Sequence, residues 1–144
     1  MNELEMWVDD LLGTFKENPS SEAMTLIESC GKCCAERNNH LEGILKLREV
    51  AAGCKTRSEY VKFLQKHIPV KIAEAKDGIV MHLGKEKCTC TLAPKIFKNF
   101  DALCNCTCGH EKALWSLFFG KSVEVEVLES FLRAGKDCVI KINF

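Results

Sequence analysis

The chain has 144 residues, of which 47% are hydrophobic and 28% charged, a composition that fits one soluble domain with a single core. Twenty basic residues balance twenty acidic ones, so no overall field attracts nucleic acid or an anionic membrane. The same neutrality leaves little charge repulsion between copies of the chain, which favours a homodimer.

The N-terminal sequence, Met-Asn-Glu-Leu-Glu-Met-Trp, is acidic and lacks the basic and apolar regions of a secretory signal. No stretch reaches the roughly 20 apolar residues that a membrane-spanning helix needs. We therefore expect a cytoplasmic protein with no membrane partner. In a reducing compartment, clustered thiols bind metal or react more often than they form disulfides.

The first half of the chain, residues 1–68, is predicted to be helical. Apolar residues recur at the i, i+3, i+4 and i+7 positions of an amphipathic helix over residues 4–15. Residues 18–20, Asn-Pro-Ser, end that helix and cap a second one. A third helix is expected over residues 41–52, and the capping box Thr-Arg-Ser-Glu at residues 56–59 begins a fourth.

The second half, residues 69–144, is predicted to form antiparallel strands around one helix. Alternating apolar residues flank the sequence Lys-Asp-Gly at 76–78, which predicts a hairpin, and a helical pattern covers residues 107–119. Residues 122–144 form a second hairpin, in which the apolar positions change parity after Val127. A strand cannot change its buried face without an irregularity, so we predict a bulge near Val127–Leu128.

Taken together, these elements predict an α+β single domain over residues 1–144. We expect the N-terminal helices to pack on a small antiparallel sheet, with one helix inserted between the two hairpins.

The ten cysteines are the residues most informative about chemistry. In the run from Cys104 to His110, an extended chain places all three thiols and the imidazole on one face. A helix instead pairs Cys104 with Cys108 and Cys106 with His110. Neither geometry closes four ligands around one tetrahedral ion, so other thiolates must contribute. We predict a zinc site with ligands drawn from five cysteines: Cys88, Cys90, Cys104, Cys106 and Cys138. Reactive thiols and inert packing are the alternatives.

A second cluster, Cys30-Gly31-Lys32-Cys33-Cys34, contains a C-x2-C sequence. Such a sequence is found in redox pairs, metal sites and iron–sulfur ligand sets. Cys30 and Cys34 also continue the apolar stripe of the second helix, so packing explains them equally well.

For catalysis, the sequence offers His110 as a general base and Cys106 as a nucleophile. A ligand role or a helix-start position are the alternatives for His110. Trp115, Phe118 and Phe131 are candidates to line an apolar ligand pocket, although aromatic residues at helical spacing more often belong to a core.

The run Leu-Cys-Asn-Cys-Thr-Cys-Gly at 103–109, the segment 119–130 and Gly-Lys-Asp-Cys at 135–138 resemble the 4-vinyl reductase type domain. Within that group, the likeness is to the small proteins named after L-2-amino-thiazoline-4-carboxylic acid hydrolase, which the Cys88-Thr89-Cys90 pair also suits. The resemblance implies helices covering an antiparallel sheet around an apolar cavity, with relatives that sense aromatic compounds.

In the aromatic-sensing relatives, cysteines and a glutamate hold a zinc ion. The resemblance places these ligand positions on Cys104, Val127, Ser130 and Cys138 of this chain. Valine and serine cannot replace a carboxylate and a thiolate, so a zinc site here needs a rearranged ligand set.

Our first expectation is therefore a binding or sensing domain for a small, partly apolar ligand, with a structural zinc ion held by cysteines. The resemblance favours a hydrolase of a small C–N or C–S substrate as the alternative. A redox or iron–sulfur protein that uses Cys30, Cys33 and Cys34 is the third reading. The sequence leaves open whether the chain is an enzyme.

Overall fold

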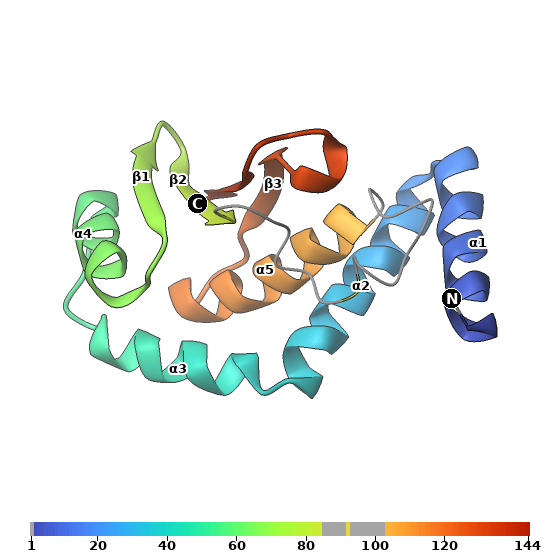
Figure 1. Cartoon of the computed structure of the whole chain (residues 1–144). Helices are drawn as coiled ribbons and strands as arrows, with labels where there is room; N and C mark the ends of the chain where they lie inside the picture. Colours follow the sequence, from blue (N-terminus) through green and yellow to red (C-terminus); the bar gives the residue numbers. More distant parts are fainter. Residues whose placement is uncertain (1, 85–91, 93–102) are drawn as a thin grey trace.

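The structure is a computed structural model that describes residues 2–84, Leu92 and residues 103–144. Its elements follow in the order α1 (Glu3–Glu17), α2 (Ser21–Arg37), α3 (His40–Val50), α4 (Arg57–His67), β1 (Lys71–Ala75), β2 (Gly78–Gly84), α5 (Leu103–Phe119), β3 (Glu124–Glu129), a 3₁₀ turn (Phe131–Arg133) and β4 (Cys138–Asn143). The predicted α+β arrangement is confirmed, since α5 is inserted between the hairpins β1–β2 and β3–β4 (Figure 1).

The predicted helix boundaries correspond to real caps. The hydroxyl of Ser20 accepts a hydrogen bond from the backbone N–H of Ala23 and begins α2. At α4, Thr56 and Glu59 form the predicted reciprocal capping box, with distances of 3.2 and 2.9 Å. The start of α3 is different, because its N-cap residue Asn39 has a left-handed conformation and makes no side-chain cap.

The sheet has the order β1-β2-β4-β3, and every neighbouring pair is antiparallel. β1 and β2 form the predicted hairpin, in which Ala75 pairs with Gly78 across a two-residue turn. The predicted irregularity in β3 is also confirmed, because the register with β4 shifts between Val127 and Glu129. A second shift, between His82 and Gly84, occurs where β2 meets the start of β4.

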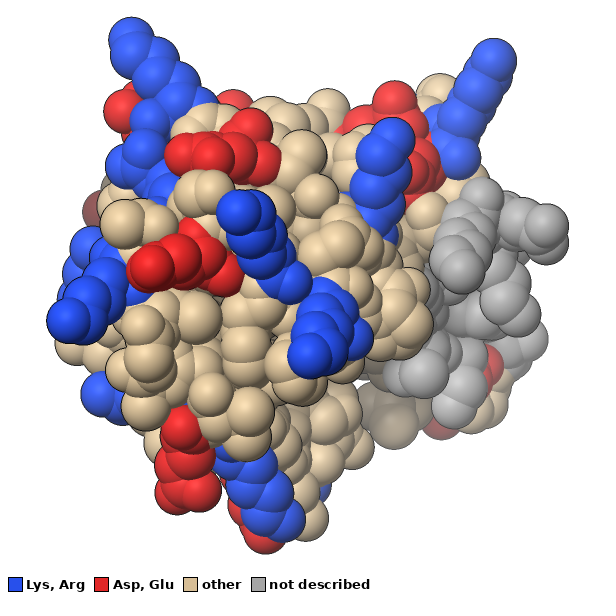
Figure 2. Space-filling model, turned by 90° about the vertical axis from the view of Figure 1, so that its left-hand side faces the viewer, with Lys and Arg blue, Asp and Glu red and all other residues tan. Residues whose placement is uncertain are grey.

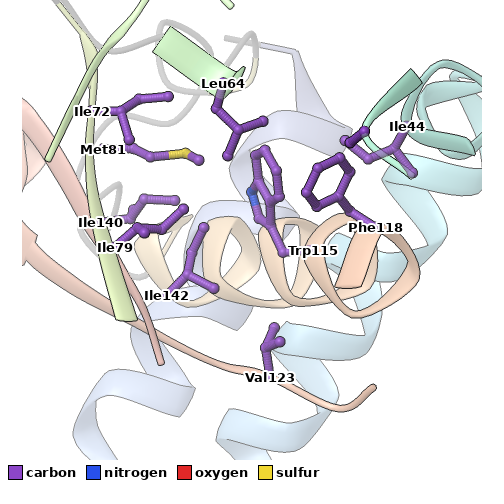
Figure 3. Packing of buried hydrophobic residues seen from close by; sticks show 11 residues of the cluster. Ile44, Leu64, Ile72, Ile79, Met81, Trp115, Phe118, Val123, Ile140 and Ile142 are labelled. Carbon is purple, nitrogen blue, oxygen red and sulfur yellow. The ribbon is translucent and has the colours of Figure 1, made fainter. Parts of the chain in front are cut away.

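The core lies between the sheet and α5. Trp115 and Phe118 of α5 are 4% and 3% exposed. Trp115 lies between Leu64 of α4 and Phe118, which is next to Ile44 of α3, and the isoleucines of β2 and β4 lie on the other side of Trp115 (Figure 3). The fully buried side chains of this core are Leu64, Ile79, Met81, Val123, Ile140 and Ile142. β4 is hydrogen-bonded along both edges, and Ile140 and Ile142 on it belong to the core cluster that contains Trp115 and Phe118.

The helix α2 packs on α5 through a face that includes only part of the predicted apolar stripe. Ala23 and Ile27 of that stripe are buried, together with Gly31 and Ala35, whereas Cys34 is half-buried and Cys30 is exposed. A Cβ atom on Gly31 would overlap the carbonyl oxygen of Cys106, so the two helix backbones are in direct contact. Small residues permit this approach, and the contact face turns from Cys30 toward Gly31 as a result.

Charged side chains of both signs are interspersed on the face that lies at the left of Figure 1, as Figure 2 shows. This face carries no extended patch of one sign, in keeping with the neutral composition.

Candidate functional site

The helix α5 decides how the cysteines of the run 104–110 are arranged. It begins at Leu103, four residues before the predicted start, so the helical alternative holds. Cys104 and Cys108 therefore lie one turn apart on one side of the helix, and Cys106 and His110 lie on another.

Cys104 lies at the end of the β3–β4 ladder, where a small cluster of buried polar groups forms. Its thiol is 3.1 Å from the hydroxyl of Ser130, and the two residues are 4% and 2% exposed. Ser130 follows Glu129, which pairs with Val139, so Cys138 lies at the same end of the ladder. The two buried thiols and the hydroxyl thus gather where β3 ends and β4 begins.

Cys108 adds a third sulfur near this cluster. Burial, and after it the carboxylate of Glu28, raise the pKa of its thiol to about 11, against a smaller opposing effect of Arg133. Cys108 is therefore a neutral thiol at physiological pH, and it is a poor nucleophile unless a cation displaces its proton.

The predicted zinc ligands are only partly described. Cys88 and Cys90 lie outside the described residues, and Cys106 lies on a different side of α5 from Cys104. Across the described residues 2–84, 92 and 103–144, no three histidine, cysteine, aspartate or glutamate side chains form a group able to hold a metal ion. Cys104 and Cys138 supply only two of the four ligands of a tetrahedral site, so the zinc ion remains a prediction that needs both Cys88 and Cys90.

The three aromatic pocket candidates have different environments. Trp115 lies in the core, and Phe131 begins the half-buried 3₁₀ turn after β3. Phe118 packs in the core and also lines a cavity of about 490 Å³ between α3, α4 and α5. The residues that line this cavity are Leu45, Arg48, Glu49, Ala51, Ala52, Tyr60, Phe118 and Phe119.

The polar and aromatic groups of this cavity are held in place by neighbouring elements. The ring of Tyr60 from α4 makes edge-to-face contacts with Phe118 and Phe119, with centroid distances of 5.8 and 5.1 Å. Arg48 of α3 donates a hydrogen bond of 3.1 Å to the carbonyl oxygen of Leu117, near the C-terminal end of α5. A cation at this position complements the partial negative charge of a helix C-terminus. The cavity therefore joins an aromatic wall to a guanidinium group.

A second, more open groove of about 570 Å³ lies between α2, α3 and α5. Its lining includes Lys32, Lys112, Ala113 and Leu117, and Lys112 also forms an ion pair of 3.2 Å with Glu124. Because this groove lacks aromatic residues, it is less suited to a flat apolar ligand.

A chain of hydrogen bonds that the sequence analysis missed connects α3 to α5. Nδ1 of His40 lies 2.8 Å from Nε2 of His110, whose Nδ1 lies 3.2 Å from the carboxylate of Glu111. The other oxygen of Glu111 accepts a hydrogen bond of 2.8 Å from the indole N–H of Trp115. The i, i+4 spacing of Glu111 and Trp115 is a signal in the sequence for the inner part of this chain. His40 is 70 residues from His110, and no local pattern connects the two.

No helix of the described segments is long and apolar enough to cross a membrane.

Comparison with known proteins gives a family but no activity. The family model described as "Family of unknown function (DUF6144)" matches residues 1–144. No curated protein matches the chain. Among solved structures, the chain is similar to a trafficking protein particle complex subunit 3 from Naegleria fowleri covalently bound to palmitic acid, with 12% identity and a TM-score of 0.48 over 97% of this chain and 92% of that one.

Proposed function

The chain belongs to the DUF6144 family, whose function is unknown, and we propose from the geometry of its site that it is a small-molecule-binding domain. The ligand would occupy the cavity between α3, α4 and α5. The observation that supports this proposal is a cavity of about 490 Å³ with aromatic and cationic groups on its walls. Ligand sites in proteins usually measure about 300–1,000 Å³ and combine an apolar lining with a few polar groups.

The lining indicates the class of ligand. Tyr60, Phe118 and Phe119 offer aromatic surface, which favours a flat or aromatic body. Arg48 offers a guanidinium group that binds carboxylates in a planar, bidentate manner. Glu49 on the same lining disfavours a second anionic group. We therefore propose a small aromatic or partly apolar monocarboxylate as the ligand.

The test uses the fluorescent probe 1-anilinonaphthalene-8-sulfonate, which combines aromatic rings with one anionic group. The variant Ala52→Trp fills the cavity from an exposed position, and Arg48→Gln removes its positive charge. We expect probe binding to be lost in Ala52→Trp and weakened about tenfold in Arg48→Gln, because a charge-assisted hydrogen bond is removed.

Two matched controls separate this cavity from other surfaces. Ala113→Trp fills the second groove, and Lys46→Ala removes an exposed charge from α3 that is paired only with Glu42 among the described residues. Both variants should bind the probe as the wild type does. Equal binding by Ala52→Trp, or loss of binding in Ala113→Trp, contradicts the proposed site.

We further propose that a structural zinc ion joins the end of the β3–β4 ladder to the segment that follows β2. Cys104 and Cys138 would supply two buried thiolates, with Cys88 and Cys90 completing the site. Zinc would serve as a tetrahedral cross-link there, and its binding energy would contribute to folding. The support for this proposal is that two thiols buried from different elements share one end of a ladder.

Elemental mass spectrometry of protein purified without an affinity tag tests the zinc proposal. We expect about one zinc ion per chain, and Cys138→Ser should lose the metal and lower the melting temperature by about 10 °C or more. The matched control is Cys33→Ser, which removes an exposed thiol of α2 and should change neither quantity. Metal-free wild-type protein that melts at the same temperature with and without a chelator contradicts a structural zinc ion.

A further inference from the structure

We propose that the hydrogen bond between His40 and His110 is a pH-sensitive latch that fastens the start of α3 to α5. The helix α3 contributes Leu45, Arg48 and Glu49 to the cavity, so its position determines the shape of that cavity. The consequence for ligand binding rests on the function proposed above, whereas the latch itself rests only on the contacts between α3 and α5.

The geometry of the pair is that of a hydrogen bond rather than a metal chelate. The ring centroids are 5.1 Å apart and the facing nitrogens 2.8 Å apart. For this distance between the nitrogens, the two ring centroids can hardly be farther apart than they are. Each of the two nitrogens therefore points directly at the other. A metal ion bound by both rings would need their nitrogen lone pairs to point at the ion, which lies outside such a short contact. Two nitrogens that point directly at each other share one proton instead.

The remaining contacts decide which ring donates. Glu111 accepts a hydrogen bond from Nδ1–H of His110, so Nε2 of the neutral ring has a lone pair and accepts. We assign Nδ1–H of His40 as the donor on this basis. Glu111 is 9% exposed and is fixed by the indole of Trp115, which orients the imidazole of His110 as a buried carboxylate does in other carboxylate–histidine pairs.

Proton counting shows when the latch opens. The bond persists when both rings are neutral and when one of them is charged, because one nitrogen still accepts. When both rings are charged, two N–H groups face each other, the bond is lost and the two cations repel each other.

The ionisable groups around the pair come from α2, α3 and α5. α5 supplies Glu111, and α3 supplies His40 itself. α2 passes His110 at Gly31, which has no side chain; the ionisable residues of α2 at this crossing are Glu28, whose backbone packs on Gly109, and Cys30 and Lys32 beside Gly31. Within the described residues, Glu111 is thus the only carboxylate hydrogen-bonded to the pair, and it can balance one positive charge but not two.

The helix α3 is well suited to move when the latch opens. Its one buried residue is Ile44, its N-cap makes no side-chain hydrogen bond, and Arg48 fastens its other end to Leu117. Segments with few buried apolar contacts open locally at low free-energy cost. Loss of one of the two polar contacts at its ends therefore releases the first turn of α3 while the core remains folded.

Hydrogen exchange of the ligand-free full chain tests the latch. Peptides that cover residues 40–50 are compared between about pH 8 and about pH 5, the range over which histidines titrate, after correction for the intrinsic exchange rate. We expect protection of α3 in the wild type to fall about fivefold at the lower pH, because about one hydrogen bond is lost. Protection of α4 should not change.

Variants at two exposed histidines make the test specific. His40→Gln cannot gain a charge and should remove the pH response of α3, whereas His67→Gln alters an exposed histidine of α4 and should keep it. A wild-type α3 with equal protection at both pH values overturns the latch, as does a His40→Gln variant that responds as the wild type does. Failure of the cavity-filling test leaves these exchange results unaffected, so the two proposals are separately falsifiable.

Discussion

At the scale of single residues, Asp137 fixes the start of β4. One carboxylate oxygen accepts a hydrogen bond of 2.7 Å from the backbone N–H of Cys138, and the other lies 2.8 Å from Nδ1 of His82 in β2. The hydrogen bond with His82 is the main cause that lowers the pKa of this carboxyl group, and the Cys138 N–H adds to it. The carboxylate therefore joins the two strands at the point where their register shifts.

The lowered pKa of Asp137 predicts a pH-dependent contribution to stability. A carboxyl group whose pKa is lowered by folding stabilises the fold at pH values above its ordinary pKa. This stabilisation is lost as the pH falls through the pKa of the folded state. We expect Asp137→Asn to lower the melting temperature by about 3 °C near pH 7 and by less near pH 2, because the carboxylate becomes protonated as the pH falls. Thermal unfolding at both pH values measures this, with Asp10→Asn, an exposed position of α1, as the control. A destabilisation of the same size at both pH values argues against the carboxylate as its source.

At the scale of elements, the crossing of α2 and α5 depends on a pair of glycines. A Cβ atom on Gly31 would overlap the backbone of α5 at Cys106, and one on Gly109 would overlap the backbone of α2 at Glu28. Each helix thus presents a glycine where the other backbone passes. Because backbone atoms cannot move aside as a flexible side chain can, the crossing has no room for an added methyl group.

This contact predicts opposite effects of the same substitution at two helical glycines. Gly31→Ala should lower the free energy of unfolding by about 2–3 kcal/mol, because the helices must separate. Gly43→Ala on α3 should raise it by about 0.5–1 kcal/mol, because a Cβ atom there meets nothing within 4 Å and alanine favours the helix. Urea denaturation measures both, and a neutral Gly31→Ala variant contradicts the close approach.

At the scale of the whole molecule, the sequence predicted the fold better than the site. Local signals such as the capping box at Thr56 and the parity change after Val127 depend on neighbouring residues, and both were correct. The predicted burial of α2 was right for Ile27 but wrong for Cys30, because the contact with α5 is centred on Gly31, which a search for apolar residues does not select. The link between His40 and His110 could not be predicted, since it joins residues distant in sequence.

The order of strands in the sheet has a consequence for biosynthesis. β4 lies between β2 and β3, and β3 pairs with β4 alone among the described strands. The ribosome makes β4 after all of these strands, so the hairpin β1–β2 and the strand β3 emerge without the partner that joins them. The four-stranded sheet therefore closes only when β4 has left the exit tunnel, and until then β2 and β3 lack the strand that joins them.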